Sequence, residues 1–301
     1  MEIFDCMIVG AGPAGLSSSL TLGRARRKVA LFDDGTNRNR VTHASHGFIT
    51  RDGIKPQEFK DIGLNEINNY PSVSYFNTTI TEIIKSPDNE KFIAKTIDGQ
   101  EIMAEKVILA TGIQEVFPIQ AVRDYYGKSL FSCPYCDGWE LRDKPLIILA
   151  EQEEYVLHMA KLVYNWSTNL VVLTNGATIS EDAEQELLKR NIKVKMEPIK
   201  NLIGENGYLQ QIELVSGEMI MSSGGFVVPS FYRPNQFAEQ LGCEVQENGV
   251  VVTDGMGRTT EKNVYIAGET EKSGPSSLII AAADGNKTAV AVNTDLTMER
   301  F

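Results

Sequence analysis

Near its N-terminus the chain reads Cys6-Met7-Ile8-Val9-Gly10-Ala11-Gly12-Pro13-Ala14-Gly15, a short apolar run that enters a GxGxxG turn. Helix-forming residues follow over 16–26, and a second apolar run occupies 28–32. A strand, a glycine turn, a helix and a second strand in this order are typical of a βαβ unit. The amides at the start of such a helix, together with its dipole, favour bound phosphates. The stretch therefore predicts a dinucleotide-binding domain.

Each glycine of the turn has a separate task in such a site. Gly10 permits the tight bend, Gly12 lets the backbone approach a pyrophosphate, and Gly15 lets the helix pack closely on the strand. Asp33 ends the second apolar run, where a carboxylate usually binds a ribose hydroxyl, and Asp34 stands beside it. Either acid fits this role, and the alternative is a glycine-rich turn that binds no ligand.

The same order of elements returns later in the chain. From Pro145 onward a strand (146–149), a helix (155–166) and a strand (170–173) follow one another. A late strand that ends at Gly268 and a small-residue helix over 276–290 resemble the missing last pieces of the first half. We expect an α/β protein of two Rossmann-like, three-layer dinucleotide-binding domains, the second inserted in the first. The split domain would comprise 1–112 and 241–301, and the insert 113–240.

Composition and charge narrow the function classes. The chain has 301 residues, 42% of them hydrophobic and 23% charged, and a formal net charge of −11. This charge argues against nucleic acid and anionic membranes as partners. No apolar run reaches the length of a membrane span, and no leader sequence is recognisable, so we expect a cytoplasmic protein.

Two of the four cysteines form the motif Cys133-Pro134-Tyr135-Cys136, while Cys6 and Cys243 stand alone. In a CxxC pair one thiolate is stabilised as a nucleophile and the second cysteine resolves the mixed disulfide. Asp137 follows directly and is placed to exchange protons with a leaving thiolate. The alternatives are half of a zinc site, for which no second ligand pair exists and no metal is expected, or an inert buried pair.

Taken together, these motifs resemble the low-molecular-weight thioredoxin reductase family over nearly the whole chain. Beside the glycine turn and the CxxC, the resemblance rests on Ala110-Thr111-Gly112 and on Asn263-Val264-Tyr265-Ile266-Ala267-Gly268. It implies FAD in the split domain, NADPH in the insert, and a homodimer. It also implies that Cys136 lies against the flavin, that Cys133 exchanges with substrate and that Asp137 is the acid–base residue. The expected FAD-binding residues are Gly10, Gly12, Pro13, Ala14, Gly15, Asp33, Asp34, Ala110, Thr111, Gly112, Gly268 and Glu269.

The chain departs from the family pattern where NADPH would bind. The glycine-rich turn of the insert is replaced by Ala150-Glu151-Gln152-Glu153-Glu154-Tyr155, and the basic run after the next strand by Thr174-Asn175-Gly176. Three carboxylates near a helix start repel a pyrophosphate, although acids are also favourable at any solvated helix N-terminus. NADPH binding is therefore predicted to be weak or absent.

Two further departures concern the flavin side. The family's Gly-Asp is Gly268-Glu269 here, and Ser276-Ser277 replaces an expected Arg-Gln pair. The motifs also look like those of thioredoxin-reductase-like dithiol oxidases that act on small natural products. His46 lies where the family's chain passes near the flavin; it is either a base or a structural residue.

The sequence thus predicts an FAD-dependent thiol–disulfide oxidoreductase that works through Cys133 and Cys136. Its substrate would be a thioredoxin-like protein or a small dithiol or disulfide. Its second electron partner would be ferredoxin or another non-NADPH partner, such as free reduced flavin or oxygen. The alternative is a non-enzymatic FAD-binding redox sensor.

Overall fold

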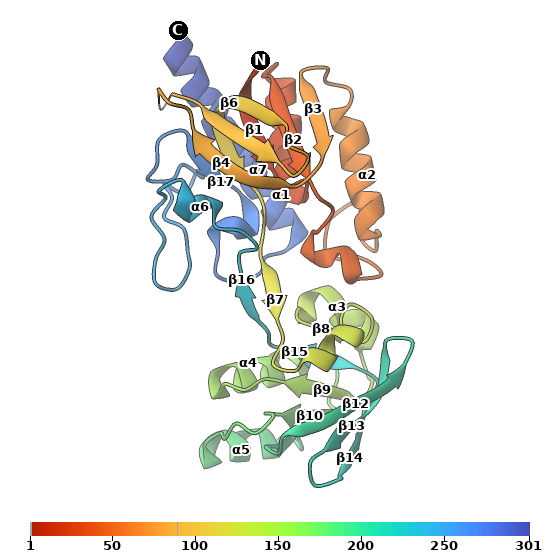
Figure 1. Ribbon diagram of the computed structural model, residues 1–301. Helices are drawn as coiled ribbons and strands as arrows, with labels where there is room; N and C mark the ends of the chain where they lie inside the picture. The colour runs from red at the N-terminus through yellow and green to blue at the C-terminus, as the bar shows by residue number, and fades with distance from the viewer. Residues whose placement is uncertain (1, 89) are drawn as a thin grey trace. The chain divides into compact units, whose positions relative to one another are not determined.

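The computed structural model describes residues 2–88 and 90–301, and its residues gather into two compact units. Unit 1 contains the chain up to Arg40, Gly47–Gln114 and Phe231–Phe301, and unit 2 contains Val41–His46 and Glu115–Ser230. The two units are described separately below (Figure 1).

Unit 1 is built on a seven-stranded sheet with the order β3-β2-β1-β6-β5-β4, and β17 pairs with β6. Strands β1, β2, β3, β6 and β17 run parallel, whereas β4 and β5 are antiparallel additions. The strands are β1 (Ile3–Val9), β2 (Val29–Asp33), β3 (Val73–Asn77), β4 (Ile80–Lys85), β5 (Phe92–Thr96), β6 (Glu101–Leu109) and β17 (Val264–Ile266).

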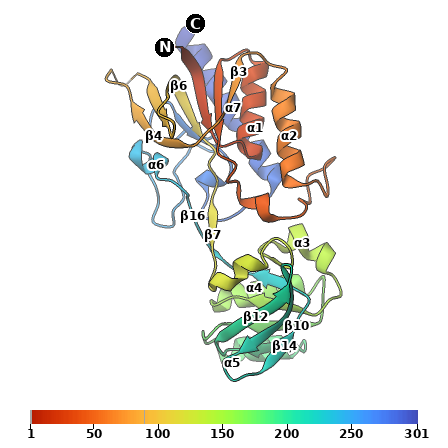
Figure 2. The same cartoon turned by 45° about the vertical axis from the view of Figure 1, so that its right-hand side comes forward.

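Alternating side chains of the parallel strands fill two separate cores. In β1, Cys6 and Ile8 pack with the helices, while Met7 and Val9 pack with the β4–β5 side of the sheet. Figures 1 and 2 show α1, α2 and α7 together on one side of the sheet. Phe237, Ala238 and Leu241 pack with Met7 and Val9 on the opposite face, so unit 1 has three layers. Its helices are α1 (Pro13–Arg24), α2 (Pro56–Ile67), α6 (Phe237–Gln240), α7 (Leu278–Arg300) and the 3₁₀ turns η1 (Arg38–Val41) and η3 (Gly268–Glu271).

Unit 2 repeats this architecture. Its parallel sheet has the order β11-β10-β9-β15-β8, and a three-stranded antiparallel sheet, β12-β13-β14, packs on one face. The helices α3, α4 and α5 belong to the same unit. Its elements are β8 (Leu130–Phe131), β9 (Leu146–Leu149), β10 (Leu170–Leu173), β11 (Lys193–Lys195), β12 (Ile199–Glu205), β13 (Tyr208–Leu214), β14 (Met219–Met221), β15 (Gly225–Val227), α3 (Pro134–Leu141), α4 (Glu153–Val163), α5 (Glu181–Leu188) and η2 (Gln120–Asp124).

The predicted α/β class and the repeated three-layer plan are confirmed, but the limits of the units differ from those expected. The chain leaves unit 1 within β7 (Gln114–Val116) and returns within β16 (Ser230–Tyr232), and these two strands pair. Residues 231–240, expected in the insert, belong to unit 1 because Phe237 and Ala238 are buried in its core. The segment Val41–His46, expected in the split domain, gathers with unit 2.

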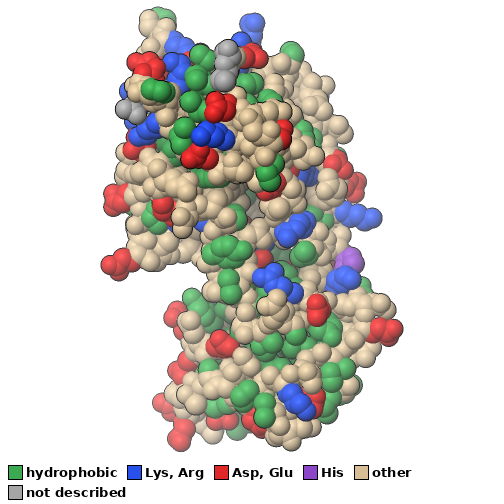
Figure 3. Space-filling view, viewed as in Figure 1, with side chains coloured by type: hydrophobic (Ala, Val, Ile, Leu, Met, Phe, Trp, Pro, Cys, Tyr) green, Lys and Arg blue, Asp and Glu red, His purple; other side chains and the backbone are tan. Residues whose placement is uncertain are grey.

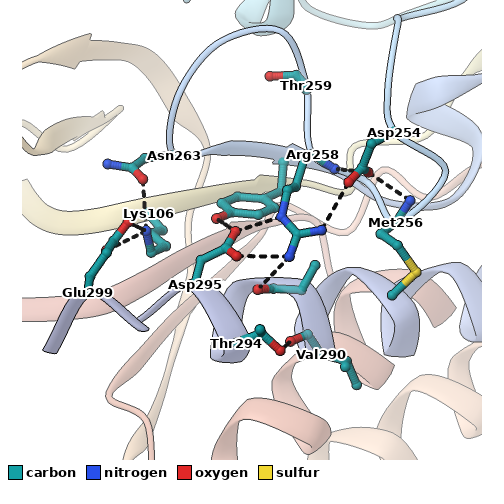
Figure 4. Close-up of polar contacts among 12 residues, drawn as sticks. Lys106, Asp254, Met256, Arg258, Thr259, Asn263, Val290, Thr294, Asp295 and Glu299 are labelled. Carbon is teal, nitrogen blue, oxygen red and sulfur yellow. Dashed lines mark hydrogen bonds and ion pairs between the residues drawn. The ribbon is translucent and has the colours of Figure 1, made fainter. Parts of the chain in front are cut away.

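The last helix is longer than its sequence pattern suggested. It was expected over 276–290 and extends to Arg300, because Ala291, Val292 and Leu296 remain buried against the sheet. Figure 4 shows ion pairs that fasten this extension. Arg258 donates to both oxygens of Asp295 at 2.7 and 2.8 Å. Lys106, which is fully buried, donates to Glu299 at 2.8 Å.

The surface is mixed in character. On the face drawn in Figure 3, Lys and Arg side chains are scattered singly among acidic and apolar ones. Within 2–88 and 90–301, no helix combines the length and the apolar character that a bilayer crossing requires.

Candidate active site

The glycine turn has the geometry that close packing demands. Gly10 has a φ of +108°, and a Cβ there would lie 2.4 Å from the Ala110 carbonyl oxygen. A Cβ on Gly15 would lie 1.7 Å from the Gly10 carbonyl oxygen. Gly12 is different, since nothing lies within 4 Å of its Cβ position and it caps α1 without a side-chain hydrogen bond. The first amides of α1 are therefore open to a ligand at Gly12.

A cleft of about 1150 Å³, including open solvent, lies over this turn in unit 1. Of the twelve residues expected to bind FAD, all but Gly15 and Gly268 line it. Gly15 instead serves the packing of helix on strand. Gly268 has a φ of +68°, and a Cβ there would lie 2.9 Å from the Cβ of Ala14. The topology thus brings together residues from both ends of the chain.

Two buried polar atoms in this cleft lack a partner within the described protein. The hydroxyl oxygens of Thr111 and Ser276 are shielded from solvent and make no hydrogen bond, and both residues line the cleft. Buried polar groups normally find partners, and an unsatisfied one costs about 1–3 kcal/mol. The cleft therefore suits a ligand with several hydrogen-bonding groups, as FAD has.

Asp33 and Asp34 occupy different environments. Asp33 is buried, accepts a hydrogen bond from the Ala11 amide at 3.1 Å and forms an ion pair with the buried Lys60. Asp34 is exposed and accepts hydrogen bonds from the amide and hydroxyl of Thr36. Asp33 is the acid that is held rigidly at the end of β2. The sequence did not indicate that Lys60 belongs to this site, because Lys60 lies on α2, far from the glycine turn along the chain.

Glu269 is also fixed by partners that the sequence did not indicate. Its carboxylate accepts from Arg38 at 2.9 Å and from the Ser276 amide at 2.6 Å. Arg38 lines the cleft and is the sole basic side chain there among the described residues. It begins the short 3₁₀ turn η1, in a polar stretch with no periodic pattern, so no local signal in the sequence marks it.

The cysteine pair lies in unit 2 and forms a disulfide, with 5.3 Å between the two Cα atoms. Cys133 is the N-cap of α3, and Cys136 lies in the first turn of that helix. A thiolate in this position is favoured by the helix dipole. The helix is seated closely, since a Cβ on Gly138 would lie 2.7 Å from the ring of Trp166.

Asp137 has the properties of a group that exchanges protons near neutral pH. Burial raises the pKa of its carboxyl to about 7, and the negative charge of Glu140 adds to the effect. A pKa near the working pH is favourable for general acid–base catalysis. Asp137 follows Cys136 in the chain, so this carboxyl and the two cysteines lie together at the start of α3. Cys6 and Cys243 are free and buried, as expected of lone cysteines, and burial raises the pKa of both thiols.

The carboxylates of the expected NADPH turn are bound within unit 2. Glu153, at the start of α4, accepts from the Ser180 amide at 2.6 Å and from its hydroxyl at 3.1 Å. Glu151 accepts from the side-chain amide of Asn175 at 2.9 Å. The Asn175 oxygen in turn accepts from the Ile199 amide at 3.1 Å. The two acids therefore bridge the segments that follow β9 and β10.

Comparisons with known proteins agree with this architecture. The pyridine nucleotide-disulphide oxidoreductase family model matches residues 4–285. The structure of the TrxB protein from Bacillus anthracis is 61% identical, with a TM-score of 0.97 over 99% of this chain and all of the other. An oxidoreductase from Agrobacterium tumefaciens is 30% identical, with a TM-score of 0.91 over 99% of both chains. Thioredoxin reductase sirT of Leptosphaeria maculans is 29% identical over 89% of this chain and 87% of its own.

Proposed function

Because the chain belongs to the pyridine nucleotide-disulphide oxidoreductase family, we propose that this FAD-dependent oxidoreductase exchanges electrons with its substrate through Cys133 and Cys136 and uses NADPH poorly. The observation that carries the exchange is the disulfide at the start of α3, with Asp137 directly after it. A thioredoxin-reductase-like activity is consistent with the relatives described above.

The cleft of unit 1 is the proposed FAD site. The amides at Gly12 would bind the pyrophosphate, Asp33 a ribose hydroxyl, and the hydroxyls of Thr111 and Ser276 further polar groups. Arg38 would neutralise part of the phosphate charge. When bound, FAD would accept or supply the two electrons of the cysteine pair.

The exchange itself needs only this chain's thiols and a substrate dithiol. A substrate thiolate attacks the Sγ atom of Cys133, the new sulfur–sulfur bond forms, and Cys136 leaves as a thiolate. The second substrate thiol loses its proton to Asp137 and attacks the substrate sulfur of the mixed disulfide; the bond from that sulfur to Cys133 breaks, and Cys133 leaves as a thiolate. The oxidised substrate leaves, and two electrons remain on the cysteine pair. The reverse sequence reduces a disulfide substrate.

Weak use of NADPH is supported by Glu151 and Glu153. Two unit charges about 6 Å apart repel by roughly 0.7 kcal/mol in water and by roughly 3 kcal/mol at an effective dielectric of about 20. Each carboxylate would thus weaken the binding of a pyrophosphate several-fold to a hundredfold. The hydrogen bonds to Ser180 and Asn175 hold both acids in place.

The proposed partners follow from this chemistry. The substrate is a thioredoxin-like protein or a small dithiol or disulfide, and the other electron partner is ferredoxin, free reduced flavin or oxygen. A homodimer is supported by the exposed apolar side chains Ile279, Ile280 and Val290 on α7. We place the protein in the cytoplasm, where a dithiol of this kind is reduced and reoxidised in turn.

Turnover of a Cys133→Ser variant tests the proposal. With dithiothreitol or reduced thioredoxin as substrate and oxygen or ferricyanide as acceptor, the variant should lose at least 99% of the thiol-dependent rate. Cys243→Ser, which changes a free buried cysteine in unit 1, is the matched control. Full turnover by Cys133→Ser would favour a flavin-binding redox sensor instead.

A further inference from the structure

A short segment from the first part of the chain, the strap Val41–His46, belongs to unit 2. It is seated closely on that unit. A Cβ on Gly127, which has a φ of +82°, would lie 2.6 Å from the Val41 carbonyl oxygen. Any side chain at residue 127 would displace the strap, so this glycine and its left-handed backbone permit the contact.

The far end of the strap meets the helix that carries the cysteines. The Nε2 atom of His46 lies 3.7 Å from a carboxylate oxygen of Glu140 on α3. Glu140 follows Asp137 by three residues, and side chains three apart share one face of a helix. His46 therefore neighbours Glu140, and Glu140 shares a helix face with Asp137, the residue that follows Cys136.

We propose that His46 and Glu140 are positioning residues for the thiol exchange: Glu140 controls the proton on Asp137, and His46 controls the charge that Glu140 presents. The proposal rests on the role of Asp137 in the proposed function. The sequence motifs did not indicate that either residue acts on Asp137, and they gave no role to Glu140.

The direction of each effect follows from the signs of the charges. An anionic Glu140 disfavours ionisation of Asp137, and it is the one charged side chain of the described residues that contributes to the raised pKa of Asp137. A positive charge on His46, 3.7 Å from the Glu140 carboxylate, offsets the charge of Glu140. Asp137 therefore releases its proton more readily when His46 is charged.

The basic side chains that follow α3 in the chain have other partners. Lys144 donates to the backbone carbonyl of Glu140 at 2.8 Å, and the guanidinium of Arg142 stacks 4.0 Å from the ring centre of Trp139. Glu140 is 43% exposed and His46 21% exposed, so solvent screens both charges and the expected effects are modest.

The test measures the pKa of Asp137 by carboxyl-carbon NMR. It uses the full-length, disulfide-bonded holoprotein labelled at aspartate. Asp137→Asn assigns the resonance. Glu140→Gln should lower the pKa of Asp137 by about 0.5, the value for a unit charge about 6 Å away in water. His46→Asn should raise it by a smaller amount. The double variant should behave like Glu140→Gln alone, because His46 acts through Glu140.

Matched controls separate this effect from a general disturbance. His43→Asn changes an exposed histidine of the same strap, and Glu181→Gln an exposed acid of the same unit; neither should move the resonance. In Glu140→Asp the pKa of Asp137 should lie between its values in Glu140→Gln and in the wild type. The pH at which Cys133 exchanges half-maximally with dithiothreitol should shift in the same direction as the pKa.

An unchanged Asp137 pKa in Glu140→Gln, or a His46→Asn effect that persists without Glu140, would overturn the proposal. The NMR measurement needs no turnover. Failure of the proposed function, seen as full activity in Cys133→Ser, is therefore distinguishable from failure of this inference.

Discussion

At the scale of single residues, Asp137 links the chemistry of the site to the stability of the fold. Its pKa lies at about 7 in the folded protein, against 3.8 for an ordinary aspartate. Between these two pH values the folded state holds a proton that the unfolded state has released. Stability therefore falls as the pH rises from about 4 to 7 and is constant above that range.

Replacement of Asp137 by Asn removes this pH dependence. Relative to the wild type, Asp137→Asn should be more stable at pH 8 and nearly equal at pH 4. The ceiling for a shift of this size is about 4 kcal/mol, and partial exposure of the side chain reduces it. Urea denaturation of the disulfide-bonded protein at both pH values measures the difference. An equal gain at both values would contradict the assigned cause.

A second prediction at this scale concerns the role of Arg38 in FAD binding. It is the basic side chain of the proposed FAD cleft and is held by Glu269 at 2.9 Å. Arg38→Leu should weaken FAD binding by roughly ten- to a hundredfold, because a charged hydrogen bond contributes about 1.5–3 kcal/mol. Fluorescence titration of the apoprotein with FAD measures this. The exposed Arg51, changed to Leu, serves as control, and equal affinities in both variants would argue against the role of Arg38.

These residues also show what a sequence can indicate. Gly10 and Gly15 were recognisable because a strand and a helix bracket them at fixed spacing, and the structure shows the close contacts that require glycine. Lys60 and Arg38 were not recognisable. Each forms an ion pair with its acidic partner, Asp33 for Lys60 and Glu269 for Arg38, only after the chain has folded. No local sequence pattern indicates such a contact.

At the scale of elements, the proposed weak binding of NADPH rests on the start of α4. The helix has no glycine turn before it, and its first acid is bound to Ser180. The acidic run had two interpretations in the sequence, a solvated helix start or a repulsive one. The structure shows a third feature, since the acids join the start of α4 to the segments after β10.

Removal of these two charges should improve NADPH binding. The double variant Glu151→Gln, Glu153→Gln should bind NADPH at least tenfold more tightly than the wild type, because two repulsive charges are lost. It should also lose up to about 1 kcal/mol of stability, since Ser180 loses a charged partner. Isothermal titration calorimetry measures the affinity. Glu181→Gln is the control, and an unchanged affinity in the double variant would show that the acids are not what excludes NADPH.

At the scale of the whole molecule, the chain repeats one three-layer plan in two units. The repeat was visible in the order of the strands and helices, because each parallel unit needs the same alternation. The limits of the two units were not visible in the sequence, because they depend on where side chains become buried. Phe237 joins the core of unit 1 six residues after the chain returns to that unit at Phe231, and only contacts in the folded protein reveal this. The same holds for the place of the strap Val41–His46 in unit 2.

In the proposed function, this protein exchanges electrons with its substrate through the cysteine pair and accepts them from NADPH only inefficiently. Anaerobic stopped-flow mixing of the oxidised FAD-bound protein with reductant tests it most directly, by following the flavin absorbance band. We expect rapid bleaching with dithiothreitol in the wild type, none in Cys133→Ser, and slow or absent bleaching with micromolar NADPH. Rapid bleaching by micromolar NADPH, or bleaching by dithiol without Cys133, would contradict it.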